Sequence, residues 1–315
     1  MRALLGNPFK PMEPVRWPVP FDDPGWLFQP KWDGIRIVAH WDGKEARLFN
    51  KRGQECTARY PEIVAALPAA LSGRTAILDG EMVVFYQGRP SFPRVMQRAL
   101  ARRPAVRAQA VAALPATYLV FDLVYLDGQE LMPLGLEERL ARLAQALAPA
   151  EPVVLTDSFP AQGRLLFAAV EERGWEGIVA KRRASPYRPG KSAYWRKIKV
   201  RRRQLCAVGG FTVTGEGAGA LLLGAYQEET FVYVGRAGSG LTAEHRRLLP
   251  DLLAPTETSQ CPFVPAPRVR GLTVRWVRPT LTVLVEYAEW TEELHLRHPV
   301  IVRFTPEPVS ACRLP

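Results

Sequence analysis

The sequence contains few residues of the kinds that bind transition metals or form covalent cross-links. Its 315 residues include four histidines and only four cysteines, which are Cys56, Cys206, Cys261 and Cys312. No two cysteines stand in a C-x-x-C spacing, and the histidines are not grouped with them. This scatter argues against a structural zinc site and against a disulfide framework.

Long apolar segments are also missing. No run approaches the roughly 18 apolar residues of a membrane-spanning helix, and the proline-rich N-terminus lacks the apolar core of a secretion signal. We therefore expect a cytoplasmic protein that does not enter a membrane. With 47% hydrophobic residues the chain can still bury a full core, and its length favours two domains over one.

Acidic residues are absent from one segment, 181–203, which contains eleven lysines and arginines. The other 292 residues carry 31 basic and 31 acidic side chains, so this segment holds the whole net charge of +11. Such a run can be an ordinary solvated face, but here Tyr187, Tyr194 and Trp195 are interleaved with the cations. Cations beside flat aromatic faces favour contact with nucleic acid, with nucleotide phosphates, or with both.

The chain up to residue 203 mixes strand and helix patterns. Five prolines within the first 20 residues predict an extended lead without regular structure. The apolar stretch 75–86 is predicted to be a pair of strands broken at Asp79-Gly80-Glu81. Periodicity and turn signals predict the other elements. These are strands at 26–30, 36–41, 46–50 and 117–126, and helices at 61–71, 94–113 (interrupted at Pro104), 136–147 and 164–173.

After residue 203 the helical pattern nearly disappears, and short apolar runs alternate with glycine-rich connectors. These runs, at 205–213, 220–226, 231–234, 274–277 and 281–290, predict a small all-β barrel of about five strands. The glycines at 215–219 resemble a dinucleotide fingerprint, but no helix pattern follows them, which favours a hairpin tip. Those at 235–240 precede a short helix at 241–249 and either turn the chain or contact a phosphate; we favour the turn.

Lys31 opens the block Lys31-Trp32-Asp33-Gly34-Ile35-Arg36, which is either a turn between strands or the setting of a nucleophilic lysine. Glu81 and Glu176 each stand at the start of an apolar strand, and each alone could be a surface turn residue. Taken with Lys31, they predict two carboxylates that hold a hard divalent cation beside a nucleophile.

Three further residues suit phosphate and base contacts. Lys197 and Lys199 stand two residues apart in a predicted strand, so their side chains share a face while Ile198 turns to the core. Two lysines aimed in the same direction can reach one phosphate. Phe121 lies in an apolar stretch, where it is either plain core or an aromatic ring that closes over a base.

The order of these blocks resembles that of the covalent nucleotidyltransferases, and specifically the ATP-dependent DNA ligases of the minimal bacterial two-domain type. The resemblance spans about residues 26–203, and more loosely the β-rich half. Ordered agreement is a stronger signal than any single block. The matching blocks are the one that begins at Lys31, then Lys51-Arg52-Gly53, Asp79-Gly80-Glu81, the run from Phe121 to Gly128, the run from Glu176 to Lys181, and Lys197-Ile198-Lys199.

The resemblance implies an α+β chain: an antiparallel-sheet nucleotidyltransferase (adenylation) domain at 1–202, followed by an OB-fold barrel at 203–315. It implies that Lys31 attacks the α-phosphate of ATP to form a lysine adenylate, which requires the neutral amine although the ordinary pKa of lysine is about 10.4. The AMP then passes to a DNA 5′-phosphate, and a 3′-hydroxyl attacks to seal the strand.

The resemblance also assigns roles to individual side chains. Gln29, Arg36, Arg52, Glu81, Phe121, Lys197 and Lys199 are expected to bind the nucleotide, with Phe121 stacked on adenine and Gln29 at the base edge. Glu81 and Glu176 are expected to hold Mg²⁺ or Mn²⁺. The expected DNA contacts are Arg52, Arg182, Arg183, Lys191, Arg201, Arg202 and Arg203.

The expected partners are nicked double-stranded DNA and proteins of DNA repair or end joining, bound by a monomeric ligase. Only 30 residues precede Lys31, so no separate N-terminal DNA-binding domain or NAD-specific domain is expected, and ATP is favoured over NAD. One block departs from the family: an R-x-D-K-type motif near the C-terminus is replaced by Arg303-Phe304-Thr305-Pro306, and no lysine follows Lys199. The alternatives are an RNA ligase, an RNA-capping guanylyltransferase, or a non-catalytic nucleic-acid-binding relative.

Overall fold

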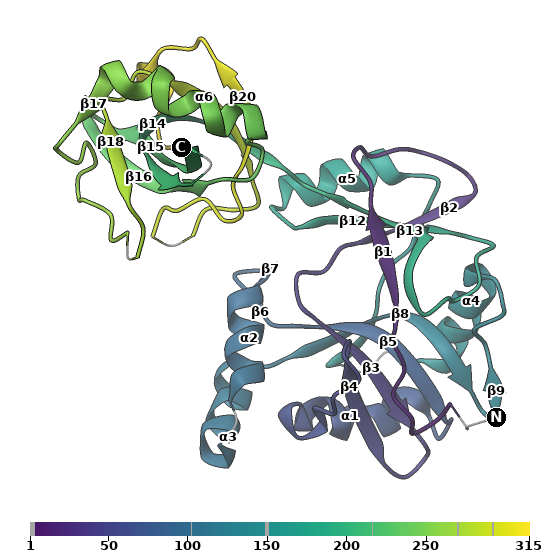
Figure 1. Cartoon of the computed structure of the whole chain (residues 1–315). Coiled ribbons are helices and arrows are strands. Elements are labelled where there is room, and N and C mark those ends of the chain that lie inside the picture. The colour runs from purple at the N-terminus through teal and green to yellow at the C-terminus, as the bar shows by residue number, and fades with distance from the viewer. Residues whose placement is uncertain (1–3, 102, 149–150, 216, 270, 292) are drawn as a thin grey trace. The chain divides into compact units, whose positions relative to one another are not determined.

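The computed structural model describes residues 4–101, 103–148, 151–215, 217–269, 271–291 and 293–315. The chain divides into two compact units, Met1–Val200 and Arg201–Pro315 (Figure 1). Strands dominate both units, and helices flank the sheets. The fold is therefore the mixed, mostly β arrangement that the sequence predicts.

Two larger sheets build the described part of the first unit. One has the order β1 (Met12–Arg16), β13 (Gly190–Lys199), β12 (Gly177–Arg182), β2 (Trp26–Pro30), β11 (Phe159–Pro160). The other has the order β10 (Val153–Leu155), β8 (Thr117–Leu126), β5 (Ala76–Val83), β3 (Ile35–Trp41), β4 (Ala46–Asn50), with β9 (Gln129–Glu130) beside β8. Neighbouring strands are antiparallel except for β1 with β13 and β10 with β8.

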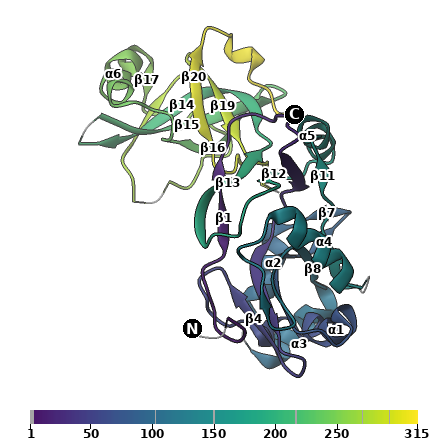
Figure 2. The same cartoon turned by 90° about the vertical axis from the view of Figure 1, so that its right-hand side faces the viewer.

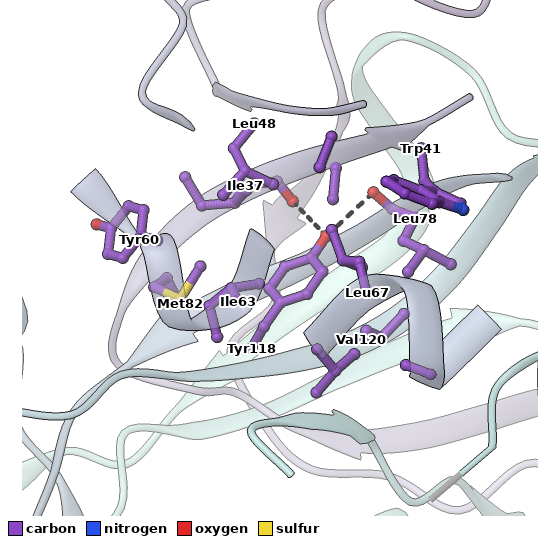
Figure 3. Packing of buried hydrophobic residues seen from close by; sticks show 14 of the residues in the cluster. Ile37, Trp41, Leu48, Tyr60, Ile63, Leu67, Leu78, Met82, Tyr118 and Val120 are labelled. Carbon is purple, nitrogen blue, oxygen red and sulfur yellow. Dashed lines mark hydrogen bonds between the residues drawn. The ribbon is translucent and has the colours of Figure 1, made fainter. Parts of the chain in front are cut away.

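Helices and a short hairpin complete this unit. The helices are α1 (Pro61–Leu71), α2 (Phe92–Leu100), α3 (Pro104–Ala113), α4 (Leu136–Ala146) and α5 (Gly163–Glu172), and the hairpin pairs β6 (Phe85–Tyr86) with β7 (Arg89–Pro90). Helix α1 follows its apolar spacing and buries Ile63, Leu67 and Leu71 against the β3–β5–β8 sheet. Tyr118 closes this core, since its hydroxyl donates to the carbonyls of Ile37 at 3.0 Å and Leu78 at 3.1 Å (Figure 3).

The proline-rich lead contains a strand, so the expectation of no regular structure there was wrong. Strand β1 pairs in parallel with β13, and Met12 in it is fully buried. Proline is tolerated here because β1 is at the edge of the sheet, where an absent N–H breaks no ladder. The lead therefore completes the sheet that carries Lys197 and Lys199.

The predicted break at 79–81 was also wrong, because β5 runs through it. Gly80 is required by packing: a Cβ there would lie 2.6 Å from the Tyr118 ring and 2.7 Å from the Leu119 carbonyl oxygen. Asp79 is fully buried and ion-paired, as described below. The glycine of the Asp79-Gly80 pair thus lets the Tyr118 ring pack directly against the β5 backbone. Glu81 lies within β5 rather than at its start.

The second unit is a seven-stranded sheet that α6 (Ala243–Leu253) packs against at β15 (Figure 2). It contains more strands than the five predicted. The strand pairs among its described residues are antiparallel, and an isolated parallel bridge joins Tyr226 to Arg313. Its strands are β14 (Arg202–Thr214), β15 (Gly217–Gln227), β16 (Thr230–Ala237), β17 (Glu257–Thr258), β18 (Val274–Val277), β19 (Thr282–Tyr287) and β20 (Val300–Thr305).

The two glycine clusters form turns. The described residues of 215–219 lie where β14 turns into β15, as predicted. Gly240 has a φ of +93°, and a Cβ there would lie 2.0 Å from the carbonyl oxygen of Ile301 in β20. Arg303, in the block that departs from the ligase family, also lies in β20. Within the described ranges, no helix has the length and apolarity needed to cross a bilayer.

Candidate active site

A cavity of about 600 Å³ in the first unit gathers residues from both larger sheets. Its walls come from β1, β2, β3, β5, β8, β12, β13 and α2, and from the end of β4 and the segment that joins it to α1. Seven of the residues assigned to the site from the sequence line it: Gln29, Lys31, Arg36, Arg52, Glu81, Phe121 and Lys197.

Lys31 and Lys199 share one carboxylate. Lys31 directly follows β2, where its backbone N–H donates to the carbonyl of Gly177 at 2.8 Å, and its Nζ is ion-paired with Glu176 Oε2. The Nζ of Lys199 lies 2.5 Å from the other oxygen, Oε1. Burial acts to raise the pKa of Glu176, but the two lysine charges outweigh burial and hold it below its ordinary value. Glu176 is therefore an ionised carboxylate between two cations at the end of β2.

Glu81 lines the cavity, whereas Glu176 and Lys199 are not among its lining residues and Glu176 contacts it through Lys31. Burial raises the pKa of Glu81 to about 7, and the nearby Glu176 and Asp79 carboxylates act in the same direction against Arg36 and Lys31. No cluster of three or more histidine, cysteine, aspartate or glutamate side chains is placed to hold a metal among the residues that the structure describes. Two carboxylates nevertheless fit Mg²⁺, which usually binds one or two of them together with substrate phosphates and water.

Arg36 is ion-paired with the buried carboxylate of Asp79. Its Nε donates to Asp79 Oδ1 and its Nη2 to Oδ2, both at 2.6 Å, and Nη2 also donates to the Met12 carbonyl at 3.1 Å. Burial acts to lower the pKa of Arg36, but the charge of Asp79 raises it above its ordinary value. Its guanidinium carbon lies 4.4 Å from the centroid of the Phe121 ring. Arg36 thus reaches the cavity as a fixed cation stacked on the aromatic ring.

The Phe121 end of the cavity also holds a lysine that the sequence did not single out. Lys181 is 2% exposed, its Nζ donates to the Phe121 carbonyl at 3.0 Å, and it lies 4.3 Å and 4.1 Å from the rings of Phe121 and Trp195. Burial lowers the pKa of Lys181 to about 7, and the charges of Asp122 and Asp79 offset only part of this effect. The one sequence signal for Lys181 is its position at the end of the run from Glu176 to Lys181.

Gln29 and Lys197 border the same space. Gln29 is buried, and its side-chain amide donates to the hydroxyl of Ser158 at 2.8 Å. Lys197 and Lys199 lie on one face of β13 with Ile198 fully buried on the other, as the spacing predicts. Burial, followed by the charges of Lys31 and Lys199, lowers the pKa of Lys197.

The residues predicted to contact DNA are not gathered in the cavity, except for Arg52. Arg183 is ion-paired with Glu137, while Arg201 and Arg203 in the second unit are both ion-paired with Glu286. Arg182, Lys191 and Arg202 are exposed. The cavity also has lining residues that the sequence did not indicate, namely Asn50, Gln54 and Arg59, and Phe92, Met96, Ala99 and Leu100 of α2.

Two protein-family profiles match most of the chain. The profile described as ATP dependent DNA ligase domain matches residues 19–199, and that of the ATP dependent DNA ligase C terminal region matches 214–307. The multifunctional non-homologous end joining DNA repair protein LigD of Mycobacterium tuberculosis is 35% identical over 279 residues, which are 86% of this chain and 35% of LigD. LigD of Pseudomonas aeruginosa is 33% identical over 276 residues, 84% of this chain and 32% of that protein. The chain thus spans about a third of the length of these relatives.

Solved structures agree with the sequence matches. The ligase domain of M. tuberculosis LigD is 31% identical, has a TM-score of 0.56 and aligns over 98% of both chains. A mycobacterial DNA ligase D complexed with ATP and MES gives the same identity and TM-score over 97% of this chain and 98% of its own. Lig E DNA ligase, at 17% identity and a TM-score of 0.59, shares the fold over 93% of this chain.

Proposed function

The chain belongs to the ATP-dependent DNA ligase family, and from this premise we propose that it seals nicks between a 3′-hydroxyl and a 5′-phosphate in double-stranded DNA. The observation that carries the proposal is one cavity that is lined by Lys31, which is ion-paired with Glu176, and by Phe121, which contacts Arg36 and Lys181. This arrangement offers a nucleophile, cations for phosphates and an aromatic face for a base. RNA ligation and RNA capping use the same lysine chemistry and remain outcomes of the test below.

Three phosphoryl transfers make up the proposed reaction. In the first, the Lys31 nitrogen attacks the α-phosphorus of ATP, loses its proton, and pyrophosphate leaves. In the second, an oxygen of a DNA 5′-phosphate attacks the same phosphorus and Lys31 leaves. In the third, the 3′-hydroxyl attacks the 5′-phosphate and AMP leaves. The protein supplies placement and charge stabilisation at each step.

The proposed roles follow the geometry. Phe121 stacks on adenine, and Gln29, held by Ser158, faces the base edge. Arg36, held by Asp79, and Lys197 line the cavity and would bind phosphates. Glu81 and Glu176 would hold Mg²⁺ or Mn²⁺, which when bound neutralises charge on the phosphates.

The cellular setting is also part of the proposal. LigD relatives are described as non-homologous end joining proteins, and a DNA ligase module needs broken DNA as its substrate. We accordingly propose a role in DNA repair, in the cytoplasm, as a monomer that acts with repair or end-joining proteins.

The deciding experiment offers the purified chain each of the four labelled ribonucleoside triphosphates, and NAD, with Mg²⁺. Intact-mass measurement should show one added AMP with ATP, and peptide mapping should place it on Lys31. Chasing the adduct onto nicked DNA and onto RNA with a 5′-diphosphate separates ligation from capping. The proposal is lost if the protein gains no nucleotide and also fails to close nicks whose 5′-ends are already adenylated.

A further inference from the structure

We propose that Arg59, together with Arg52, forms a second phosphate subsite in the cavity, and that its occupant is a backbone phosphate of the DNA strand. This inference rests on the proposed ligase function. No sequence pattern indicated Arg59, which lies in a short 3₁₀ helix, Thr57–Arg59, before α1. It lines the same cavity as Lys31 and Phe121.

The local structure fixes both arginines. Arg59 is flanked by Cys56, which is 5% exposed, and Tyr60, which is 1% exposed. Its backbone N–H donates to the Cys56 carbonyl at 2.9 Å. The turn that carries Arg52 is organised by Asn50, whose side-chain oxygen accepts from the backbone N–H groups of Arg52 and Gln54 at 2.9 Å and 3.1 Å. Backbone hydrogen bonds therefore order the chain segments that carry both arginines.

Charge then points to an anionic ligand. Three other cations of the cavity have acidic partners: Arg36 has Asp79, Lys31 has Glu176, and Lys51 has Glu13 at 3.8 Å. Lys181 and Lys197 also line the cavity and form no ion pair among the described residues, but Lys181 donates to the Phe121 carbonyl and is enclosed by the rings of Phe121 and Trp195. In the part of the chain that the structure describes, the side chains of Arg52 and Arg59 have no ion pair and no hydrogen bond. Two arginines facing one cavity without acids suit a phosphate, which guanidinium groups bind by paired hydrogen bonds.

Strand register places this subsite away from the base. Asn50 of β4 pairs with Ile37, Ile37 with Gly80, and Gly80 with Val120, the residue next to Phe121. Asn50 is thus three strand spacings from Val120, or about 14 Å. The side chains of Lys31 and Arg36 lie in the same cavity. A nucleotide stacked on Phe121 would therefore leave the Arg52 and Arg59 end for a different phosphate.

The apolar wall supports a DNA strand as the occupant. Helix α2 contributes Met96, Ala99 and Leu100 to the cavity, and Leu100 is 60% exposed. A sugar–phosphate chain presents phosphates on one side and apolar C–H faces of its sugars on the other. The two arginines at this end of the cavity can bind the phosphates of such a chain, and the aliphatic face of α2 can contact its sugars. The triphosphate of ATP has no sugar faces beyond its ribose, so it would leave the α2 face without a partner.

Two rates and one binding measurement test the subsite with the full chain. The first rate is AMP-adduct formation from ATP without DNA, and the second is sealing of a nick already adenylated at its 5′-end. Arg59→Ala should slow the second by about 10- to 100-fold, the loss expected for a charge-assisted hydrogen bond, and leave the first unchanged. Arg59→Lys should recover part of the rate. Arg74→Ala, which removes an exposed arginine outside the cavity, is the matched control.

The binding measurement keeps the test valid even if the chain proves inactive. The salt dependence of affinity for nicked DNA should flatten by about one ion in Arg59→Ala and stay unchanged in Arg74→Ala, with both proteins melting as the wild type does. A loss confined to adduct formation would overturn DNA as the occupant and assign the phosphate to ATP. Wild-type rates and an unchanged salt slope in Arg59→Ala would overturn the subsite itself.

Discussion

Glu176 accepts a hydrogen bond from the Nζ of Lys31 through one carboxylate oxygen, and its other oxygen lies 2.5 Å from the Nζ of Lys199. The carboxylate therefore positions the proposed nucleophile and ties it to β13. In the proposed reaction Lys31 attacks phosphorus through its nitrogen lone pair, so its Nζ would separate from Glu176 when ATP binds. Glu176 would then keep its contact with Lys199, and its other oxygen is the one that we propose for a divalent cation.

Replacing Lys31 by Ala should abolish AMP attachment and leave affinity for nicked DNA largely intact. In the proposed reaction this side chain forms the only bond between the protein and AMP, whereas DNA binding draws on many separate cations. Intact mass after incubation with ATP and Mg²⁺ gives the first quantity, and a salt titration of DNA binding gives the second. Lys44→Ala, in the exposed β3–β4 turn, is the control and should behave as the wild type. Joint loss of labelling and DNA binding in a folded Lys31→Ala protein would contradict the assigned role.

Phe121→Ala should weaken ATP binding by about 1–3 kcal/mol, the range for stacking of a base on an aromatic ring, or roughly 5- to 150-fold. The variant is best made in the Lys31→Ala background, so that calorimetry measures binding without reaction. Tyr125→Ala in the same strand is the control, because Tyr125 lies outside the cavity. Equal affinities in the parent and the Phe121 variant would remove the ring from the base site.

Much of the first unit was predictable because its signals are local. Strands β2 and β4 and helix α1 have the predicted bounds, since turn residues and apolar spacing mark both ends of each. That seven of the expected site residues line one cavity was predictable for a similar reason: Lys31 and the Lys197 block each lie within or next to a strand whose pattern is visible in the sequence.

The features that were not predicted depend on partners far away in the sequence. Strand β1 forms only because β13, about 180 residues later, offers it an edge. The Asp79-Gly80 pair has the composition of a turn, yet Arg36 and the Tyr118 ring hold it inside a sheet. Arg59 enters the cavity because Cys56 and Tyr60 are buried on either side. No local pattern encodes such contacts, and packing decides them.

Lys181→Met should remove a pH dependence of stability above neutral pH. The pKa of Lys181 falls from an ordinary 10.5 to about 7 on folding, so between these values the unfolded chain binds the extra proton. The unfolding free energy should therefore rise with pH from about 7 to 10.5, by on the order of 3–5 kcal/mol, and be constant below 7 as far as this group is concerned. Urea unfolding at several pH values measures the difference between the two proteins.

The control for this prediction is Lys44→Met, which replaces an exposed lysine in the same unit. Other groups also titrate above pH 7, so the meaningful quantity is the difference from wild type at each pH. That difference should favour Lys181→Met at pH 7 and shrink as pH rises. Parallel curves for wild type and Lys181→Met would show that the lysine is not desolvated.

Glu286→Gln should strengthen DNA binding and steepen its salt dependence. Glu286 is 13% exposed and neutralises both Arg201 and Arg203, so its loss frees two guanidinium groups for phosphates. Arg202, which is exposed, needs no such release, and Arg202→Ala should lower the salt slope by about one ion. Glu293→Gln makes the same charge change at an 85% exposed side chain. If both glutamine variants raise affinity equally in filter-binding titrations, net charge is the cause and the arginine pair does not contact DNA.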